Sequence, residues 1–504
     1  MAATIDTDRI LGRCQEHVGV IDIGSNSIRL VVYDDLGRAP FPRFNEKSFT
    51  ALGAGLDDSG RFTEDAIADA RRAIRRFAAI ARAMNVRRIE AIATEATRRA
   101  ENGRELLAAI EADTGLRTQL LSGEDEATYA ALGVVCGFHR PTGLVGDLGG
   151  GSLEVAEVVV DRVGERTASM PIGALPVRDL MADDPDAAKS RVDEVLAESL
   201  PPLLTEPTLF AVGGGWRALA RVHIATNERS IGVVHGYAIP ADEARSFAKK
   251  IARMGPEEVA GLPDVPSRRV ETLPAAALVL SRVLKRLAPE QVVFSAYGLR
   301  EGWLYAQLDP TEQARDPLLE GAQTIGLPDA RVPAFSAALA EWTDDLFPGE
   351  SPDDRRLRLA ACALTDLCWR DHVKVQASEA FRRILHVPFI GLTHRERAFL
   401  AVTIMSRYDG KLDESTAAAV DDELSASDLR RAEILGRALT LGHRLSASVP
   451  ELLRHARLRI DADAVRLEVS SPDEVPDGDA VLARVRRLAR ATGVDGAEIV
   501  RTTD

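Results

Sequence analysis

Apolar residues in the first part of the chain gather in short runs that are separated by polar turns. One run covers residues 18–22, a polar turn covers 24–27, and a second run covers 28–33. A strand, a tight polar turn and a second strand form the pattern of a β-hairpin. Further along, apolar residues recur every three or four positions from Ala66 to Ala81, after a threonine and two acids. This spacing predicts an amphipathic helix with an N-cap and an acidic first turn.

The same arrangement returns in the second part of the chain. Residues 143–147 are typical of a strand, the turn at 149–152 contains three glycines and a serine, and residues 155–160 form a β-branched run. Each block therefore opens with a strand, an acid, a glycine–serine turn and a second strand, which indicates a duplicated α/β fold. Beyond about residue 318 the pattern is almost entirely helical. We therefore predict three domains, at residues 1–136, 137–317 and 318–504.

Length, composition and cysteine content restrict the class of protein. A chain of 504 residues has room for roughly two to four domains of ordinary size. The apolar runs are too short to cross a bilayer, and the first residues lack the apolar region of a secretory signal. The four cysteines are scattered and form no CxxC pair, which is typical of reduced thiols. We therefore expect a cytoplasmic protein with no membrane partner.

The two acid–glycine–serine turns carry the strongest chemical signal. In the segments DIGSNS at 22–27 and DLGGGSLE at 147–154, glycines and small polar residues expose N–H groups and hydroxyls that can hold phosphate oxygens. A carboxylate at the strand end can bind a metal ion or its water shell. Either turn alone could be an ordinary hairpin turn, because Asn, Ser and Gly are common turn residues. Two such hairpins are better explained by two phosphate loops that face one cleft.

This duplicated pattern resembles the actin, Hsp70 and sugar-kinase superfamily, and five segments narrow the resemblance to the Ppx/GppA family of exopolyphosphatases and guanosine pentaphosphate phosphohydrolases. Residues 22–29 look like the first phosphate loop of that family. Residues 147–154 look like the second loop, with Leu153 in place of the usual threonine. The other three segments are ATEATRRAEN at 93–102, LSGEDEA at 121–127 and FSAYGLREG at 294–302.

The resemblance implies two ribonuclease-H-like lobes of the actin-like ATPase type around a cleft, followed by an all-α, HD-like C-terminal domain. Where an HD domain would carry a His–Asp pair, this chain has Thr365 and Asp366. His372, His386 and His394 follow without a clear ligand spacing. We therefore expect a degenerate, non-catalytic domain that forms a homodimer or a wall of the substrate channel, or that serves only to pack the chain.

The resemblance also implies roles for single residues. Glu126 matches the general base that activates the attacking water, although beside Glu124 and Asp125 it could be only an acid at a helix start. The expected ligands of Mg²⁺, or of Mn²⁺, are Asp147, Glu154 and Asp22. The expected phosphate contacts are Gly24, Ser25, Asn26, Ser27, Arg98 (or its neighbour Arg99), Gly149, Gly150, Gly151 and Ser152.

Two further segments leave alternatives open. The glycines Gly213, Gly214 and Gly215 correspond to the nucleoside side of the superfamily cleft and could line a nucleoside or chain site. Trp216 and Arg217 follow them, and they could stack on a base, exclude one, or merely begin a helix. A basic run at Arg71, Arg72, Arg75 and Arg76 is typical of a solvated helix face, with guidance of a polyanion as the alternative.

The reaction implied by the resemblance is release of terminal phosphates from inorganic polyphosphate by water that Glu126 activates. Hydrolysis of guanosine pentaphosphate (pppGpp) is the alternative, because both substrates would use the same loops. The Glu126 segment disfavours an ATP-using kinase, and the intact motif acids disfavour a nucleotide sensor that binds without turnover. The net charge of −14 argues against DNA as a partner. It also requires that the positive charge which holds a polyanion be concentrated locally.

Overall fold

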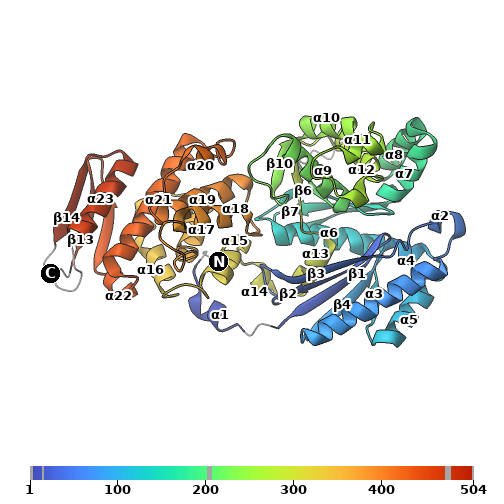
Figure 1. Cartoon of the computed structure of the whole chain (residues 1–504), viewed down its shortest axis with the longest axis horizontal. Helices are drawn as coiled ribbons and strands as arrows, with labels where there is room; N and C mark the ends of the chain where they lie inside the picture. The colour runs from blue at the N-terminus through green and yellow to red at the C-terminus, as the bar shows by residue number, and fades with distance from the viewer. Residues whose placement is uncertain (1–3, 14–15, 201–206, 471–477, 502–504) are drawn as a thin grey trace. The chain divides into compact units, whose positions relative to one another are not determined.

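The computed structural model divides into two compact units, which are coloured along the chain in Figure 1. The larger unit is Gln15–Gln313, and the smaller unit combines Met1–Cys14 with Ala314–Asp504. The larger unit holds two mixed β-sheets with helices, and the smaller one is largely helical, which confirms the predicted fold class. The structure describes residues 4–13, 16–200, 207–470 and 478–501. Within these ranges, no helix is both long and apolar enough to cross a membrane.

The first sheet carries the hairpin predicted from the opening apolar runs. Its strands are β1 (Val18–Ile23), β2 (Ser27–Tyr33), β3 (Pro42–Phe49), β4 (Arg88–Ala93) and β5 (Thr118–Leu120). They lie in the order β3-β2-β1-β4-β5, with β1 antiparallel to β2 and parallel to β4. Helices α3 (Glu64–Ala83) and α5 (Gly103–Thr114) lie along one face of this sheet (Figure 1). The predicted N-cap of α3 is present, because the Thr63 hydroxyl accepts a hydrogen bond from the N–H of Ala66.

The second sheet repeats this design with six strands. They are β6 (Thr142–Leu148), β7 (Leu153–Val159), β8 (Arg162–Met170), β9 (Thr208–Val212), β10 (Tyr237–Pro240) and β11 (Gln291–Phe294), in the order β10-β11-β9-β6-β7-β8. The β6–β7 hairpin matches the β1–β2 hairpin down to one hydrogen bond. The N–H of Gly24 donates to the carbonyl of Ser27 at 3.1 Å, and that of Gly149 donates to Ser152 at 2.9 Å. The duplication inferred from the sequence is therefore present in the backbone of both turns.

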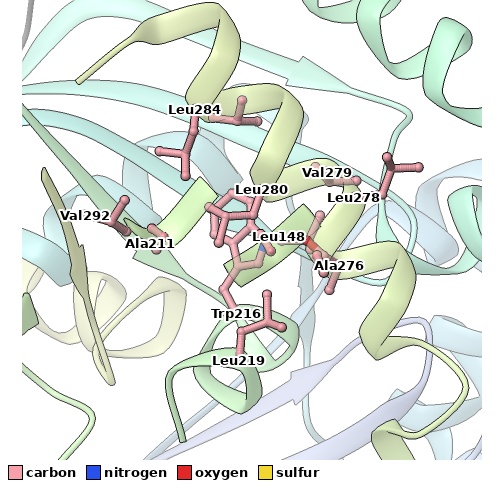
Figure 2. Close-up of a cluster of buried hydrophobic side chains, with 14 of the residues drawn as sticks. Leu148, Ala211, Trp216, Leu219, Ala276, Leu278, Val279, Leu280, Leu284 and Val292 are labelled. Carbon is pink, nitrogen blue, oxygen red and sulfur yellow. Dashed lines mark hydrogen bonds between the residues drawn. The ribbon is translucent and has the colours of Figure 1, made fainter. Parts of the chain in front are cut away.

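Trp216 lies at the centre of the core behind the second sheet. It belongs to α9 (Gly214–Thr226), and it packs against α12 (Leu273–Leu287). Figure 2 shows its ring among Leu148, Leu280 and Leu284, and the side chain is fully buried. The indole N–H donates to the carbonyl of Ala276 at 3.0 Å, which satisfies its only polar group. Trp216 is therefore a core residue, and its ring is not available to stack on a ligand.

Two helices connect the halves of the larger unit. They are α6 (Gly123–Gly137), which packs on the second sheet, and α13 (Leu299–Ala306), which packs on the first. They cross where a side chain would not fit. A Cβ on Gly133 would overlap the carbonyl of Gly298, and a Cβ on Gly302 would overlap the carbonyl of Tyr129. Because glycine has no Cβ, the two helices come close enough to hold the halves together.

The smaller unit differs in one respect from the predicted all-α domain, because it also contains a three-stranded sheet. Its helices include α15 (Pro317–Gly326), α16 (Phe335–Trp342), α17 (Pro352–Ala363), α18 (Gln376–His386), α19 (His394–Arg407), α21 (Ala426–Ser446) and α23 (Asp479–Thr492). The strands are β12 (Ala456–Ile460), β13 (Ala464–Val469) and β14 (Gly496–Arg501). Buried and exposed residues alternate along β12. The sequence analysis missed these strands because their Leu, Ala and Arg residues are also good helix formers.

Candidate active site

A cleft of about 220 Å³ in the larger unit receives residues from both halves. The turns of both hairpins line it, together with the start of α9 and of α13. Its acidic lining residues are Asp22, Glu126, Asp147 and Glu154. Its basic lining residues are Arg29, Lys47, Arg217, Arg269 and Arg300. No aromatic ring is found in this lining, as far as the structure describes the chain.

The acids Asp147 and Glu154 face each other across the β6–β7 hairpin. Glu154 is only 4% exposed and accepts a hydrogen bond from the Ser169 hydroxyl at 3.1 Å. Burial, with the nearby Glu126 carboxylate, raises the pKa of Glu154 well above its usual range. Burial also raises the pKa of Asp147 to about 6. Neither carboxylate has a basic side chain within ion-pair distance among the described residues, so no ion pair offsets the burial that disfavours their charged forms.

Glu126 turns into the cleft from the first turn of α6. The hydroxyl of Ser122 and the carboxylate of Asp125 form the capping box of this helix, and Glu124 is exposed to solvent. The three consecutive acids therefore have different roles. Glu126 is buried and accepts a hydrogen bond from Nη1 of Arg98 at 2.7 Å. Burial outweighs this contact and raises the pKa of Glu126 to about 7, which suits a general base at neutral pH.

Arg98 and Arg99 each donate a hydrogen bond to a carboxylate. Arg98 donates to Glu126 and to the carbonyl of Leu121, and it does not line the cleft. Arg99 donates to Glu95 at 2.8 Å. The geometry thus gives Arg98 a positioning contact with the candidate base, and its predicted contact with phosphate stays a prediction.

Most of the predicted phosphate-binding residues lie together in the cleft. Those that line it are Gly24, Ser25, Asn26, Ser27, Gly149 and Gly150. The two loops touch, because a Cβ on Gly150 would overlap the hydroxyl of Ser25. Gly151 and Ser152 lie behind this surface. A Cβ on Gly151 would overlap the carboxylate of Glu95, and Ser152 is buried beside Glu154, whose pKa it lowers against the larger effect of burial.

The third glycine segment enters the cleft only in part. Gly213 and Gly214 line it, whereas Gly215 packs against Ala276 in the core. Gly213 has φ +103°, which favours glycine. The guanidinium of Arg269 lies directly against Gly214, where a Cβ would overlap it. A cation therefore covers the segment that the sequence analysis considered for a nucleoside.

Four cations in the lining of the cleft form a basic arm, defined here as Arg29, Lys47, Arg217 and Arg269. Arg29 donates to the amide oxygen of Asn45, and Arg217 donates to the carbonyl of Ala296, both at 2.7 Å. Within the described residues, no carboxylate lies at ion-pair distance from any of the four. Burial, with the neighbouring Arg269 and Arg29, lowers the pKa of Lys47 to about 8, although part of this residue is exposed to solvent.

The sequence analysis assigned no role to the basic arm. One signal was present, because Arg29 stands opposite Asp22 in the first hairpin as Glu154 stands opposite Asp147 in the second. The duplicated turns therefore carry an arginine in one copy and a carboxylate in the other. Lys47 and Arg269 lie far from the motifs in sequence, and only the tertiary fold brings them to the cleft.

Asp22 differs from the other predicted metal ligands. Its carboxylate accepts from Nη1 of Arg300 at 2.8 Å, so it already has a cationic partner. Although burial opposes it, the charges of Glu301 and Asp22 raise the pKa of Arg300. The arginine of the GLREG segment thus fixes the end of β1, and a metal ion would share Asp22 with it.

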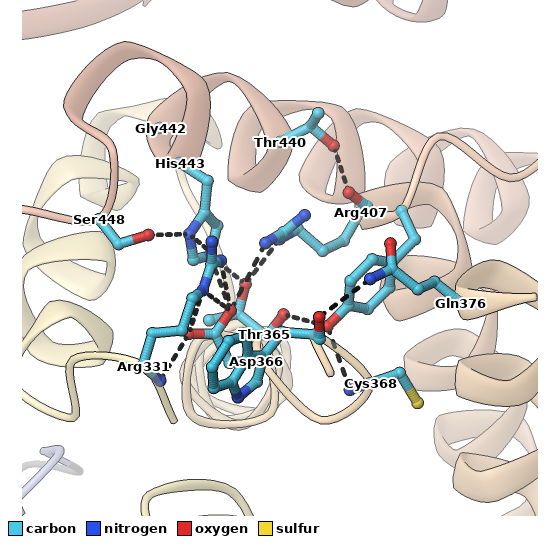
Figure 3. A network of polar contacts seen from close by, with 12 residues as sticks. Arg331, Thr365, Asp366, Cys368, Gln376, Arg407, Thr440, Gly442, His443 and Ser448 are labelled. Atoms are coloured by element: carbon cyan, nitrogen blue, oxygen red, sulfur yellow. Dashed lines mark hydrogen bonds and ion pairs between the residues drawn. The ribbon is translucent and has the colours of Figure 1, made fainter. Parts of the chain in front are cut away.

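The HD-like position in the smaller unit is a network of buried polar side chains (Figure 3). Asp366 accepts from Arg331 at 2.6 Å, and Nη2 of Arg407 lies 3.6 Å from it. The Thr365 hydroxyl is 2.9 Å from Nε2 of His443, a residue that the sequence analysis did not consider. No group of three His, Cys, Asp or Glu side chains suited to a metal ion occurs among the described residues. Arginine side chains therefore neutralise Asp366 in this unit.

Comparison with known proteins places these observations in a family. Residues 31–311 match the model of the Ppx/GppA phosphatase family. The chain belongs to this family. Residues 318–499 match a second model, described as the C-terminal part of exopolyphosphatase. The family recognised from the five motifs is confirmed, and the chain is an enzyme of a phosphatase family.

Individual relatives agree with this assignment. Exopolyphosphatase 1 of Mycobacterium tuberculosis is 33% identical over 309 residues, which are 58% of this chain and 88% of that protein. Retrograde regulation protein 2 of Saccharomyces cerevisiae is 27% identical over 439 residues, covering 79% of this chain and 73% of that protein. The crystal structure of the Aquifex aeolicus member of the Ppx/GppA family has a TM-score of 0.51 and 25% identity, and the match covers 58% of this chain and 97% of that one.

Proposed function

We propose that this enzyme is an exopolyphosphatase that releases orthophosphate from the end of inorganic polyphosphate. The observation that carries the proposal is the lining of the cleft, which combines four carboxylates with the cations of the basic arm and has no aromatic ring among the described residues. A polyphosphate chain is charged at every unit, so each cation of the arm has a phosphate to meet. The name of the 33% identical mycobacterial relative, Exopolyphosphatase 1, supports the same substrate.

The alternative substrate, guanosine pentaphosphate, requires a place for its base. Small-molecule pockets that hold such groups are usually lined by apolar and aromatic side chains. Here Trp216 is buried in the core, and Arg269 covers Gly214. The same arrangement disfavours an ATP-using kinase and a nucleotide sensor. Polyphosphate therefore fits the cleft better than a nucleotide does.

A magnesium or manganese ion fits the residues that are present. Asp147 and Glu154 are carboxylates without a cationic partner among the described residues, and burial disfavours their charges. Mg²⁺ is typically held by one or two carboxylates together with substrate phosphates and water, so a three-residue cage is not required. When bound there, the ion would neutralise negative charge on the terminal phosphate. Asp22 would contribute only by sharing its carboxylate with Arg300.

The residues of the chain would activate the water, position the base and bind the phosphates. Glu126 takes a proton from a water molecule as its oxygen attacks the terminal phosphorus, and Arg98 holds the carboxylate in position. The bond from that phosphorus to the bridging oxygen breaks, and the shortened chain leaves with this oxygen. The N–H group of Gly150, which lines the cleft, would donate to the transferred group, whereas that of Gly149 already donates to Ser152. The basic arm would hold the phosphates of the leaving chain.

Phosphate release by the purified protein with Mg²⁺ tests the proposal. Long-chain polyphosphate and pppGpp would be compared in parallel, with Glu126→Gln as the inactive variant. We expect release from polyphosphate and a loss of about 10²- to 10⁴-fold in Glu126→Gln, the usual contribution of a general base. Glu124→Gln serves as the matched control, because it makes the same substitution at an exposed residue in the same helix turn. Turnover of pppGpp alone, or equal rates in the two variants, would refute the proposal.

A further inference from the structure

Five cations on the outside of the second half form a surface that nothing above assigns. Arg245, Lys249 and Lys250 lie on α10 (Ala241–Ile251), Arg253 follows that helix, and Lys285 lies in the last turn of α12. Both helices are labelled in Figure 1. All are exposed except Arg245, which is half-buried. Chain segments about 30 residues apart thus contribute to one basic surface. These five residues are named the α10–α12 patch.

The patch is not neutralised from within the protein. None of its five side chains has a carboxylate at ion-pair distance among the residues that the structure describes. Asp193 is paired with Arg282, and Glu243 with His223. Glu258 lines the same surface hollow as Lys249, Lys250 and Arg253, where it accepts a hydrogen bond from the N–H of Gly255. The positive neighbours, Arg245 first, lower the pKa of Lys249, which shows that the charges lie close enough to repel one another.

The basic run on α3 gives a useful contrast. Arg71 and Arg75 both bind Asp113, Arg72 binds Asp69, and Arg76 binds Glu46. The run that is conspicuous in the sequence is therefore neutralised by acids. Helix C-termini favour cations, which accounts in part for Lys249, Lys250 and Lys285. The α10–α12 patch differs from a single helix end, because the C-terminal turns of two helices and Arg253 all contribute cations to it.

Helix α12 connects the patch with the cleft. Its N-cap residue Thr272 lines the cleft, and Arg269 of the basic arm lies three residues earlier. The helix has 15 residues, so its last turn lies about 20 Å from the cleft along one rigid element. A flexible chain with a negative charge at every unit can reach both places at once. A short oligophosphate held in the cleft cannot.

We propose that the α10–α12 patch binds the distal part of a long polyphosphate chain whose end occupies the cleft. This inference rests on the proposed substrate of the enzyme. The patch adds affinity for long chains by a second contact with the same molecule, because the second binding event is then intramolecular. The enzyme therefore prefers long chains, and this preference depends on ionic strength.

Equilibrium binding in an inactive background tests the patch without relying on turnover. The variant Lys249→Gln/Lys250→Gln/Arg253→Gln would be made together with Glu126→Gln. The matched control is Arg71→Gln/Arg72→Gln/Arg75→Gln in the same background, which removes equal charge from another helix surface. Affinities for long-chain polyphosphate and for tripolyphosphate would be measured over a range of salt concentrations, and thermal unfolding would show that each variant is folded.

We expect the patch variant to bind long-chain polyphosphate roughly tenfold or more weakly, and tripolyphosphate as its parent does. The slope of log affinity against log salt should fall by about 2, because each lost phosphate contact on a single strand removes about 0.7. If the active enzyme hydrolyses no polyphosphate while the patch variant still shows this loss, the proposed function fails and the patch stands. If the patch variant binds long chains as the control does, the patch inference is wrong.

Two further probes separate other polyanions from polyphosphate. Duplex DNA and vesicles rich in phosphatidylserine would be tested with the same variants. Loss of binding to DNA or to vesicles, with unchanged binding of polyphosphate, would overturn the inference and assign the patch to that partner.

Discussion

At the scale of single residues, the cleft is defined by which charges have partners. Asp22 is paired with Arg300, and Glu126 with Arg98. Asp147 has no basic side chain at ion-pair distance among the described residues, and neither does Glu154. The second hairpin therefore holds two buried acids without an ion-pair partner, and the basic arm holds four cations without one. This lining suits a substrate that meets a metal ion at one end and cations along its length.

Lys47 gives a prediction for the pH dependence of the enzyme. Its pKa of about 8 lies below the usual value of 10.5, so the ammonium is charged below pH 8 and loses its charge above it. Because the charged form attracts phosphate, kcat/KM for polyphosphate should fall as the pH rises through about 8. In Lys47→Arg this fall should move to higher pH, because arginine stays protonated.

Steady-state kinetics between pH 6 and 10 measure this effect, with Lys189→Arg on the exposed surface of α8 (Pro185–Ser199) as the control. An unchanged descending limb in Lys47→Arg would show that another group controls it.

At the scale of secondary-structure elements, the close contact between α6 and α13 holds the two halves of the larger unit together. A Cβ on Gly302 would overlap the carbonyl of Tyr129. Gly302→Ala should therefore destabilise the larger unit by about 1–3 kcal/mol, as overpacking usually does. This effect opposes the gain of about 1 kcal/mol that alanine normally brings to a helix.

Urea unfolding measures the change in free energy for Gly302→Ala. Gly232→Ala is the control, because a Cβ at Gly232 would meet nothing within 4 Å. Equal stability of the two variants would mean that the helices can separate at no cost.

The polar network of the smaller unit gives a second prediction at this scale. Asp366 is 2% exposed and is bound by Arg331, with Arg407 beside it. Asp366→Asn would leave both guanidinium groups without a compensating charge, which typically costs 3–5 kcal/mol in a buried pair.

Asp345→Asn is the matched control, because its pair with Arg457 is exposed and such pairs contribute about 0–1 kcal/mol. Urea unfolding of both variants provides the comparison. A similar loss in both would mean that the buried network does not hold the smaller unit together.

At the scale of the whole molecule, metal binding should increase the thermal stability of the folded protein. Saturating Mg²⁺ should raise the Tm of the parent, because a ligand at 100 times its Kd adds about 2.7 kcal/mol to the folded state. Glu154→Gln should lose this gain. Without metal it should be at least as stable as the parent at neutral pH, because the folded protein raises the pKa of Glu154 and so disfavours its charge.

Thermal unfolding with and without Mg²⁺ tests this prediction. Glu157→Gln on the same strand is the control and should keep the response to Mg²⁺, because Glu157 is paired with Arg166. A full response in Glu154→Gln would place the ion elsewhere.

The sequence by itself determined the features that depend on neighbouring residues. The two hairpins, the cap of α3 and the acids at 147–154 follow from local patterns, because a turn or a cap involves only a few consecutive residues. The five motifs also identified the family, since their order along the chain is specific. The domain boundaries and the homodimer remain predictions.

Only the tertiary structure decided which side chains are buried, paired or free. It placed Trp216 in the core, and it brought Lys47 and Arg269 to the cleft from segments without a motif. It also showed that Arg71 is neutralised whereas Lys249 has no acidic partner among the described residues. Burial and ion pairing depend on residues that are distant in sequence and adjacent only after folding, so no local pattern encodes them.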